Sequence, residues 1–249
     1  MYNGGMDFKK LGVALLVLIV VAAGFGLWAS RANAPGLVLE ERHILTGTTT
    51  PQGDYKYTED APYYTITARY PAGRLAIETA LAANIAQFKE DGNFANLTAE
   101  DVQIQGLGPD RKYALDMEYK TYQSPAYTSY LYTVYADTLG AHPNGYFLTF
   151  VFDKQGNEVS LVQLFPNNPS WLEELSLTVS EDVVAQLKQR TGLDDITGSV
   201  FAEGLATKEE NFQNFIIDGD TLVIEIPPYQ VAAYALGSFE VKTPLKGLQ

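Results

Sequence analysis

Two histidines are the only imidazole groups that this sequence offers for metal binding or acid–base catalysis. His43 and His142 lie far apart along the chain, there is no cysteine, and no HExxH motif occurs. A catalytic zinc site needs about three protein ligands that converge on an open coordination position. We therefore predict no metal site and no cofactor, and we interpret His142 as a turn residue that is restricted by the following Pro143.

Paired carboxylates are the second feature that could support chemistry, because glycoside hydrolysis uses two of them. The pairs in this chain are adjacent in sequence, at residues 173–174, 194–195 and 209–210. Adjacent residues point to different sides of a helix, so we interpret these pairs as solvated surface. No GxSxG motif for a serine nucleophile is present. We predict no catalytic residues, and an envelope glycan hydrolase or deacetylase stays open as an alternative.

Tyrosines form the most informative group. Seven of the 16 lie between residues 119 and 146. Side chains alternate between the two faces of a strand, so Tyr130 and Tyr132 share one face while Tyr127 and Tyr135 share the other. Two interpretations remain, namely cross-strand packing in a core, or a binding surface for a protein or a glycan. On the second interpretation, Tyr130 and Tyr132 are candidate ligand-binding residues.

The elements that position these side chains begin with a β-rich run at residues 63–70, which stops at Pro71. A helix follows, because apolar residues recur at spacings of four, four and three over residues 77–88, and Gly92 ends it. Residues 113–122, 127–138 and 146–153 predict three strands. The last is apolar on both faces, which is typical of a central strand. A turn at residues 153–157 leads to a further strand at residues 159–165.

The C-terminal half combines helices with a hairpin. Asn168 and Ser180 each predict a helix start, and the second helix runs to Arg190. Residues 215–217 and 222–226 flank an Asp-Gly-Asp turn and predict a hairpin, while residues 239–244 predict a last strand. Strands grouped around a few helices indicate an α+β fold, with an antiparallel sheet or meander and a few packed helices.

An uncharged hydrophobic segment begins at Leu11 and ends at Ala29. As a helix it is about 28 Å long, close to the roughly 30 Å hydrocarbon core of a bilayer. Lysines at positions 9 and 10 precede it, so the positive-inside rule places the N-terminus in the cytoplasm. A cleaved signal peptide is the alternative, with a small-x-small site at residues 32–34, but Pro35 disfavours cleavage there.

We therefore predict a single-pass protein of the cell membrane, with the bulk of the chain outside the cytoplasm and the lipid bilayer contacted by residues 11–29. The segments are a cytoplasmic tail (1–10), a transmembrane helix (11–29), a flexible tether (30–60), a small α+β subdomain (61–125) and a second α+β domain (126–249). The tether prediction depends on the Gly, Thr and Pro content of residues 46–53.

The charge balance narrows the range of partners. The formal net charge is −13, and residues 11–249 carry 15 basic and 29 acidic residues. Nucleic acid is excluded as a partner, because its binding requires a basic surface that displaces counterions. The acidic excess favours a cationic partner, although solubility alone also explains it.

Three segments carry a resemblance to a known family. Residues 140–144 (GAHPN), 211–224 (NFQNFIIDGDTLVI) and 228–237 (PYQVAAYALG) resemble the C-terminal extracytoplasmic domain of the lysozyme-binding anti-sigma factors, which also occurs in peptidoglycan N-acetylmuramic acid deacetylases. Residues 63–94 resemble the small N-terminal domain that usually accompanies it. Ala233 stands where the family has proline, and ten residues precede the hydrophobic segment. Because these ten residues cannot hold a sigma factor and no deacetylase motif is visible, neither activity is carried over.

The resemblance implies a binding or sensing module at the cell wall, which recognises a lysozyme-like cationic protein or a peptidoglycan fragment. It directs attention to His142 and Asn144 in a turn, and to Tyr229 and Tyr234 in the closing motif, as ligand-binding residues. Each has a simpler explanation, because Asn144 and Gly145 fit a hairpin turn and the two tyrosines fit core positions beside a proline. A scaffold for another membrane protein is the remaining alternative.

Overall fold

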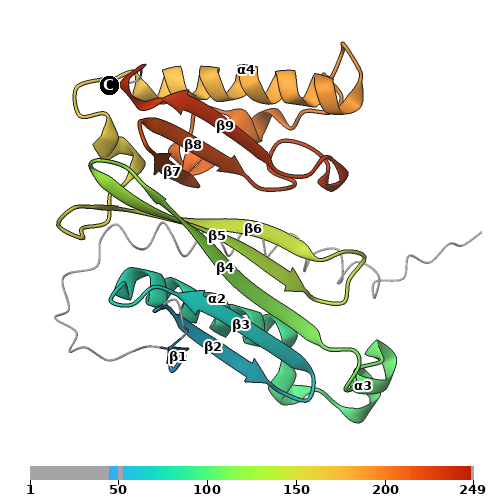
Figure 1. Cartoon of the computed structure of the whole chain (residues 1–249). Helices are drawn as coiled ribbons and strands as arrows, with labels where there is room; N and C mark the ends of the chain where they lie inside the picture. The colour runs from blue at the N-terminus through green and yellow to red at the C-terminus, as the bar shows by residue number, and fades with distance from the viewer. Residues whose placement is uncertain (1–44, 50–52, 248–249) are drawn as a thin grey trace, which may run out of the picture. The chain divides into compact units, whose positions relative to one another are not determined.

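The computed structural model describes residues 45–49 and 53–247, which carry two β-sheets and two long helices (Figure 1). The predicted cytoplasmic tail and transmembrane helix lie outside these ranges. Among the helices described, none has the length and apolar character needed to cross a bilayer. Within the described residues the mixture of helices with mainly antiparallel sheets confirms the predicted α+β class.

The larger sheet has six strands in the order of the sequence. Its neighbours are antiparallel except for the third and fourth strands, which are parallel. Parallel neighbours need a long crossover, and the helices between them supply it. The strands are β1 (Thr48–Thr49), β2 (Tyr55–Asp60), β3 (Tyr64–Tyr70), β4 (Tyr113–Gln123), β5 (Tyr127–Asp137) and β6 (Asn144–Asp153), and the crossover contains α2 (Leu75–Gly92), η2 (Phe94–Asn96) and α3 (Ala99–Gln105).

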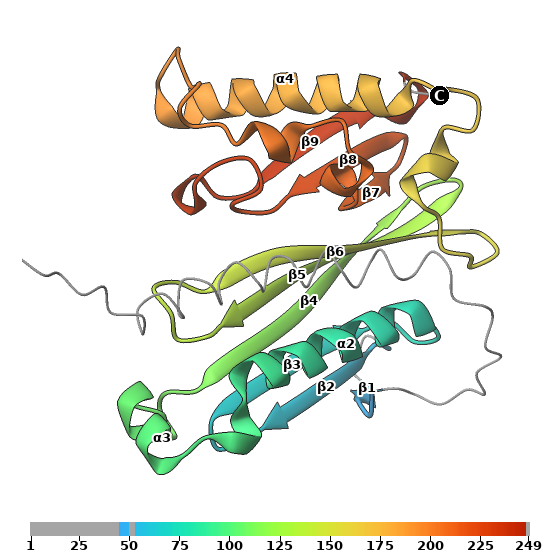
Figure 2. The same ribbon diagram turned by 180° about the vertical axis from the view of Figure 1, so that it is seen from behind.

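Helix α2 covers one face of this sheet (Figures 1 and 2). The stripe predicted from the sequence is the buried face of the helix, and the helix ends at Gly92 as predicted, so this prediction is confirmed. Each large apolar side chain that leaves water contributes about 2 kcal/mol to folding. The stripe packs against β3, β4 and β5 through Ile77, Leu81, Ile85, Phe88, Ile66, Tyr70, Leu115, Met117 and Tyr132.

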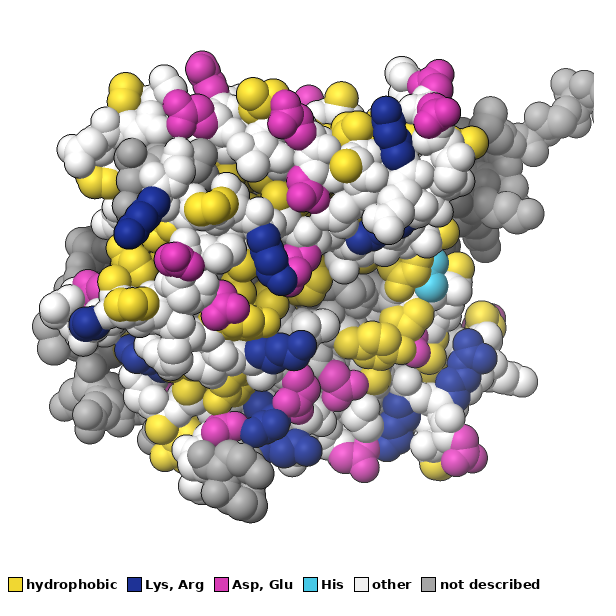
Figure 3. Space-filling model, turned by 45° about the horizontal axis from the view of Figure 1, so that its top comes forward, with side chains coloured by type: hydrophobic (Ala, Val, Ile, Leu, Met, Phe, Trp, Pro, Cys, Tyr) yellow, Lys and Arg dark blue, Asp and Glu magenta, His cyan; other side chains and the backbone are white. Residues whose placement is uncertain are grey.

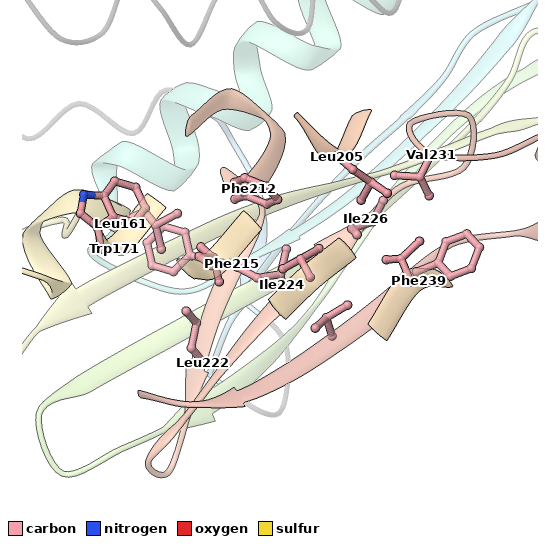
Figure 4. Packing of buried hydrophobic residues seen from close by; sticks show 14 of the residues in the cluster. Leu161, Trp171, Leu205, Phe212, Phe215, Leu222, Ile224, Ile226, Val231 and Phe239 are labelled. Atoms are coloured by element: carbon pink, nitrogen blue, oxygen red, sulfur yellow. The ribbon is translucent and has the colours of Figure 1, made fainter. Parts of the chain in front are cut away.

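The smaller sheet has three antiparallel strands and is covered by the longest helix, α4 (Trp171–Thr191) (Figures 1 and 2). The strands are β7 (Phe215–Asp218), β8 (Thr221–Ile226) and β9 (Phe239–Pro244), and three short 3-10 helices precede them, namely η3 (Leu161–Leu164), η4 (Ala202–Leu205) and η5 (Glu209–Phe212). Two more follow β8 and β9, η6 (Tyr234–Leu236) and η7 (Leu245–Gly247). Figure 4 shows the apolar side chains of β7, β8 and β9 converging on those of the preceding loops and helix.

The two sheets meet where β7 lies across β5 and β6. A small apolar cluster of Leu131, Ile216 and Val223 fills part of this contact. Two side-chain hydroxyl groups also hold β7 against the large sheet. The first is that of Ser129, because Ile217 N donates to Ser129 Oγ (2.9 Å) and Ser129 Oγ donates to Ile217 O (3.2 Å).

The second hydroxyl group, that of Thr149 on β6, makes the same two kinds of hydrogen bond to the backbone before and at the start of β7. Phe215 N donates to Thr149 Oγ1 (3.1 Å), and Thr149 Oγ1 donates to Gln213 O (3.2 Å). An edge strand normally leaves such backbone groups without a strand partner. Side-chain hydroxyls of β5 and β6 therefore satisfy the edge of β7.

The predicted tether is wrong in part. Residues 30–44 lie outside the described ranges, but Tyr55–Asp60 forms β2, which pairs with β3 along its whole length. Tyr70 fixes the preceding segment, because its hydroxyl donates to Leu45 O (2.7 Å) and accepts from Gly47 N (3.0 Å). The period of two in YKYTED was hidden by the Gly- and Thr-rich residues before it.

Two further predictions about strands are corrected by the structure. Residues 159–165 contain η3 instead of a strand, since Ser160 and Gln163 form a capping box. Strand β6 is at the edge of its sheet and not in the centre. Both of its faces are apolar because one packs against the α2 core and the other against the α4 half.

The remaining corrections concern boundaries. One continuous helix, α4, replaces the two helices predicted from Asn168 and Ser180. The predicted subdomain boundary at residues 125 and 126 falls inside a hairpin, because β4 and β5 pair along ten residues across it. Pairing of this length joins both sides of the boundary in one sheet.

Candidate functional site

The connection between β5 and β6 presents His142 in a defined orientation. His142 Nδ1 lies 3.0 Å from Pro143 O, and its Nε2 lies 2.9 Å from Tyr229 Oη. A carbonyl oxygen only accepts, so Nδ1 donates and, in the neutral ring, Nε2 accepts from the Tyr229 hydroxyl. The imidazole therefore bridges two segments that are 87 residues apart in the sequence.

The loop that follows β8 presents Tyr229. Its backbone has φ +70°, and 46% of the residue is exposed. The neighbouring Gln230 fixes this conformation, because its side-chain amide donates to Gly204 O (3.1 Å) and Asn211 O (2.8 Å). A Cβ atom on Gly204 would come within 1.9 Å of Gln230 O, so only glycine permits this approach.

Tyr234 completes a group of three rings, which we call the ring cluster (His142, Tyr229 and Tyr234). The rings of His142 and Tyr234 stack with centroids 3.8 Å apart and planes 14° apart. The Tyr229 ring lies 5.4 Å from that of Tyr234 and 5.9 Å from that of His142. Tyr234 Oη donates to Pro143 O (2.8 Å), so the same carbonyl holds both the tyrosine and the histidine.

Backbone strain accompanies the ring cluster. Among the described residues three non-glycine residues have positive φ, and Asn93 is explained as the C-terminal cap of α2. The other two are Leu139 (φ +57°) in the β5–β6 connection and Tyr229 in the loop after β8. Such a conformation costs about 1–2 kcal/mol and persists only where the surrounding structure enforces it, as at many binding sites.

The structure thus brings together three of the six residues that the sequence singled out as ligand-binding. Asn144 is the first residue of β6 and pairs with Ala136, so Asn144 and Gly145 belong to a strand and not to a hairpin turn. In the part of the chain that the structure describes, no hydrogen bond joins the Asn144 side chain to the rings.

Tyr130 and Tyr132 lie in the core, away from the ring cluster. They are 8% and 0% exposed, and they face α2 together, which confirms that they share one face of the strand. Tyr132 Oη donates to Arg69 O (3.0 Å), and burial raises the pKa of the Tyr132 phenol. The packing interpretation of these two tyrosines therefore fits the structure, and the binding-surface interpretation does not.

A carboxylate network that sequence reasoning missed lies on β2. Glu59 accepts hydrogen bonds from Tyr57 Oη (2.5 Å), Tyr64 Oη (2.5 Å) and Lys89 Nζ (2.6 Å). Burial alone would raise the pKa of Glu59, but these donors outweigh burial and lower it to about 2. Because three donors occupy the carboxylate, it is unsuited to general acid–base catalysis.

A groove of about 440 Å³ lies on the described surface. The Asp153 carboxylate on its wall already accepts from the backbone N–H groups of Gln155 and Asn157 and from the Asn157 side chain. Within the described ranges, no group of three or more His, Asp or Glu side chains could hold a metal ion. The groove is lined by Tyr127, Asp153, Asn157, Glu158, Val159 and Gln163.

On the face shown in Figure 3, acidic and basic side chains are interspersed among hydrophobic ones. They do not gather there into a large patch of one sign.

Comparisons with known proteins identify a domain and a fold. Residues 163–246 match the family described as "Protein of unknown function (DUF3298)". This range contains Tyr229 and Tyr234, while His142 lies before it. Among curated proteins the chain has no match.

Two solved structures are similar to this chain in fold. A member of the DUF3298 family from Bacteroides fragilis has 16% sequence identity and a TM-score of 0.51, with 78% of this chain and 90% of that chain covered. A DUF3298 family protein from Pseudomonas aeruginosa has 12% identity and a TM-score of 0.50, with 80% and 93% covered. At such identities the similarity concerns the fold alone, so the lysozyme-binding and deacetylase branches are not distinguished by it.

Proposed function

We propose that this chain is a non-catalytic binding module of the cell envelope, anchored through residues 11–29, whose ring cluster contacts a cationic protein of the lysozyme type. The observation that carries this proposal is the exposed ring of Tyr229, which is held in a strained backbone conformation against His142. The resemblance of residues 211–237 to lysozyme-binding domains supplies the class of partner.

The ring cluster has properties that favour protein recognition. Tyrosine offers a large contact area with few rotatable bonds, so little conformational entropy is lost on binding. Here that loss is smaller still, because the Tyr229 hydroxyl already interacts with His142 Nε2 and Gln230 anchors the loop. Such pre-organised aromatic side chains are frequent hot spots of protein interfaces.

Charge supports the cationic nature of the partner. The chain has a formal net charge of −13 and a sequence pI of about 4.5. Opposite net charge accelerates encounter between two proteins, and the acceleration decreases as salt screens the field. Binding is therefore expected to weaken with ionic strength, mainly through a slower association rate.

Titration of the full-length chain in detergent micelles with a basic lysozyme tests the proposal. We expect binding at low salt, and we expect Tyr229→Ala to weaken it by about tenfold or more, as truncation of an interface tyrosine typically does. Tyr135→Ala is the matched control, since Tyr135 is 43% exposed and lies outside the ring cluster. This control should bind as the parent chain does.

Two outcomes would contradict the proposal. Absence of lysozyme binding at low salt would contradict the proposed class of partner. Equal losses of affinity in Tyr229→Ala and Tyr135→Ala would show that the ring cluster is not the contact site. Soluble peptidoglycan fragments belong in the same titration. If they bind while lysozyme does not, the module recognises glycan instead of protein.

The anchor needs a separate experiment. Protease added to intact cells should degrade the large fragment, because the positive-inside rule places it outside the cytoplasm. If the large fragment is protected in intact cells and degraded after permeabilisation, the orientation is the opposite of the proposed one.

A further inference from the structure

A buried carboxyl group lies on the face of β8 that is turned away from α4. Glu225 is 7% exposed, whereas the residues on either side of it, Ile224 and Ile226, belong to the α4 core. In the register of the small sheet Glu225 stands directly opposite Glu240 of β9. Residues that are directly opposite in an antiparallel pair project from the same face, so two carboxyl groups lie side by side.

The groups around this pair come from two elements. On β9, Lys242 Nζ lies 2.7 Å from Glu240 Oε1. From β4, Lys120 and Tyr122 interact electrostatically with Glu225. The positive charge near the pair is therefore mainly directed at Glu240, and Glu225 depends on its neighbouring carboxyl group.

Two adjacent carboxyl groups form a hydrogen bond with each other only when one of them carries a proton. Burial raises the pKa of Glu225 most, the charge of Glu240 and the hydrogen bond with it raise it further, and Lys242 and Lys120 oppose them, with a net pKa of about 7. Near neutral pH the shared proton is consequently lost, and like charges then face each other across the strand pair.

This pair is close to the ring cluster along the chain. Ile226 ends β8, the two prolines at positions 227 and 228 follow, and the next residue is Tyr229. Proline fixes the backbone angle φ at positions 227 and 228, so few free backbone rotations separate the carboxyl pair from Tyr229. The backbone N–H of Glu225 itself donates to Asn214 O (2.8 Å), which ties this position to the start of β7.

We propose that the Glu225–Glu240 carboxyl pair is a proton-dependent clamp at the end of the small sheet, which holds the Tyr229 loop in place when the proton is shared and loosens it when the proton is lost. The expected effect of this clamp on lysozyme binding rests on the proposed function. The loosening of the Tyr229 loop can be tested without any ligand.

Hydrogen–deuterium exchange of the full-length chain in detergent micelles measures the loosening directly. After correction for intrinsic exchange, protection of residues 221–236 should fall by about tenfold between about pH 5.5 and pH 8, as expected for an opening linked to one proton. Glu225→Gln should remove this pH dependence, because glutamine donates to Glu240 as the protonated acid does. The matched control is Glu173→Gln on the exposed side of α4, which should behave as the parent chain does.

A histidine in the ring cluster provides the competing explanation for any pH dependence. His142→Gln should therefore keep the pH-dependent protection of residues 221–236. The proposal is overturned if Glu225→Gln retains the full pH dependence, or if His142→Gln abolishes it.

Lysozyme titrations at the same two pH values separate this inference from the proposed function. If lysozyme binds, its affinity should decrease by about tenfold from about pH 5.5 to pH 8 in the parent chain and stay constant in Glu225→Gln. Constant affinity in the parent chain would overturn the link to the loop. If lysozyme binds at neither pH, the proposed function fails, and the exchange measurement alone decides whether the clamp exists.

Discussion

Glu59 on β2 is half-buried and Glu225 on β8 is buried, and the structure provides for the two carboxyl groups in opposite ways. Glu59 is surrounded by three donors and has a pKa of about 2. Glu225 faces a second carboxyl group and has a pKa of about 7. The large sheet thus supplies hydrogen-bond donors to its half-buried carboxylate, whereas the small sheet relies on a proton from solvent.

The tyrosines of the two sheets differ in the same sense. Tyr132 on β5 is fully buried, and its hydroxyl is satisfied by Arg69 O. Tyr229, after β8, is exposed and has a strained backbone, and its side chain contacts His142 and Tyr234. We therefore expect the α2 half to be the more stable one, and the end of β8 in the α4 half to respond to pH.

The largest effect that the comparison predicts concerns Tyr132. Tyr132→Ala should lower the free energy of unfolding by about 3–5 kcal/mol, because it leaves a cavity beneath α2 and removes the donor to the half-buried Arg69 carbonyl. Chemical denaturation followed by tryptophan fluorescence measures this. Tyr135→Ala, on the opposite face of the same strand, should change the value by less than about 0.5 kcal/mol.

The next effect concerns the hydroxyl contact between the sheets. Ser129→Ala should lower the free energy of unfolding by about 2 kcal/mol, since both backbone groups of Ile217 lose their partner in a buried position. Thr128→Ala, whose hydroxyl donates to Gln123 at an exposed site, serves as the control. Equal stability of the two variants would mean that β7 is held by apolar packing alone.

The pH dependence of the two carboxyl groups should have opposite signs. The pKa of Glu59 is lowered from 4.5, so its contribution is present above about pH 4.5 and lost as the pH falls through about 2. Glu59→Gln should therefore cost about 1–2 kcal/mol at neutral pH and nothing below about pH 2. The two denaturation curves should converge in acid.

For Glu225 the pKa is raised, so its contribution is present below about pH 4.5 and lost as the pH rises through about 7. Glu225→Gln should match the parent chain in acid and exceed it in stability by about 1–2 kcal/mol above about pH 8. If the stability differences of Glu59→Gln and Glu225→Gln from the parent chain changed with pH in the same direction, the two carboxyl groups would not differ as proposed.

The smallest effect concerns Tyr229. Glycine adopts positive φ without strain, and this gain offsets the lost ring contacts, so Tyr229→Gly should change the free energy of unfolding by less than about 0.5 kcal/mol. Lysozyme binding should nevertheless decrease by about tenfold. A large loss of stability would assign Tyr229 to the fold and not to recognition.

The sequence predicted the elements whose pattern is local. The stripe of α2 and the Asp-Gly-Asp hairpin of β7 and β8 repeat at the spacing that their own geometry requires, so both are found where they were expected. Strand β2 was missed because its alternation covers six residues and follows a segment rich in turn formers. Residues 159–165 were misassigned because a capping box competes with β-branched residues there.

The sequence predicted the residues of the candidate site one by one, but it could not predict how they are arranged in space. His142 and Tyr229 are 87 residues apart, and no periodicity relates the two loops. Glu225 was overlooked, although a signal existed, since it is the one charged residue in the apolar run LVIEI. A carboxyl group in such a run has to be exposed at a margin, paired or protonated.

The hydroxyl contact at β7 has a consequence for the order of folding during synthesis. Ser129 and Thr149 belong to hairpin strands that leave the ribosome before β7 does, and domains fold as their N-terminal parts become available. The large sheet can therefore present the hydroxyl groups of Ser129 and Thr149, each of which both donates and accepts, to strand β7 when it is synthesised later. Interruption of translation after β6 would leave this template unoccupied, with the apolar face of β5 and β6 accessible to other nascent chains.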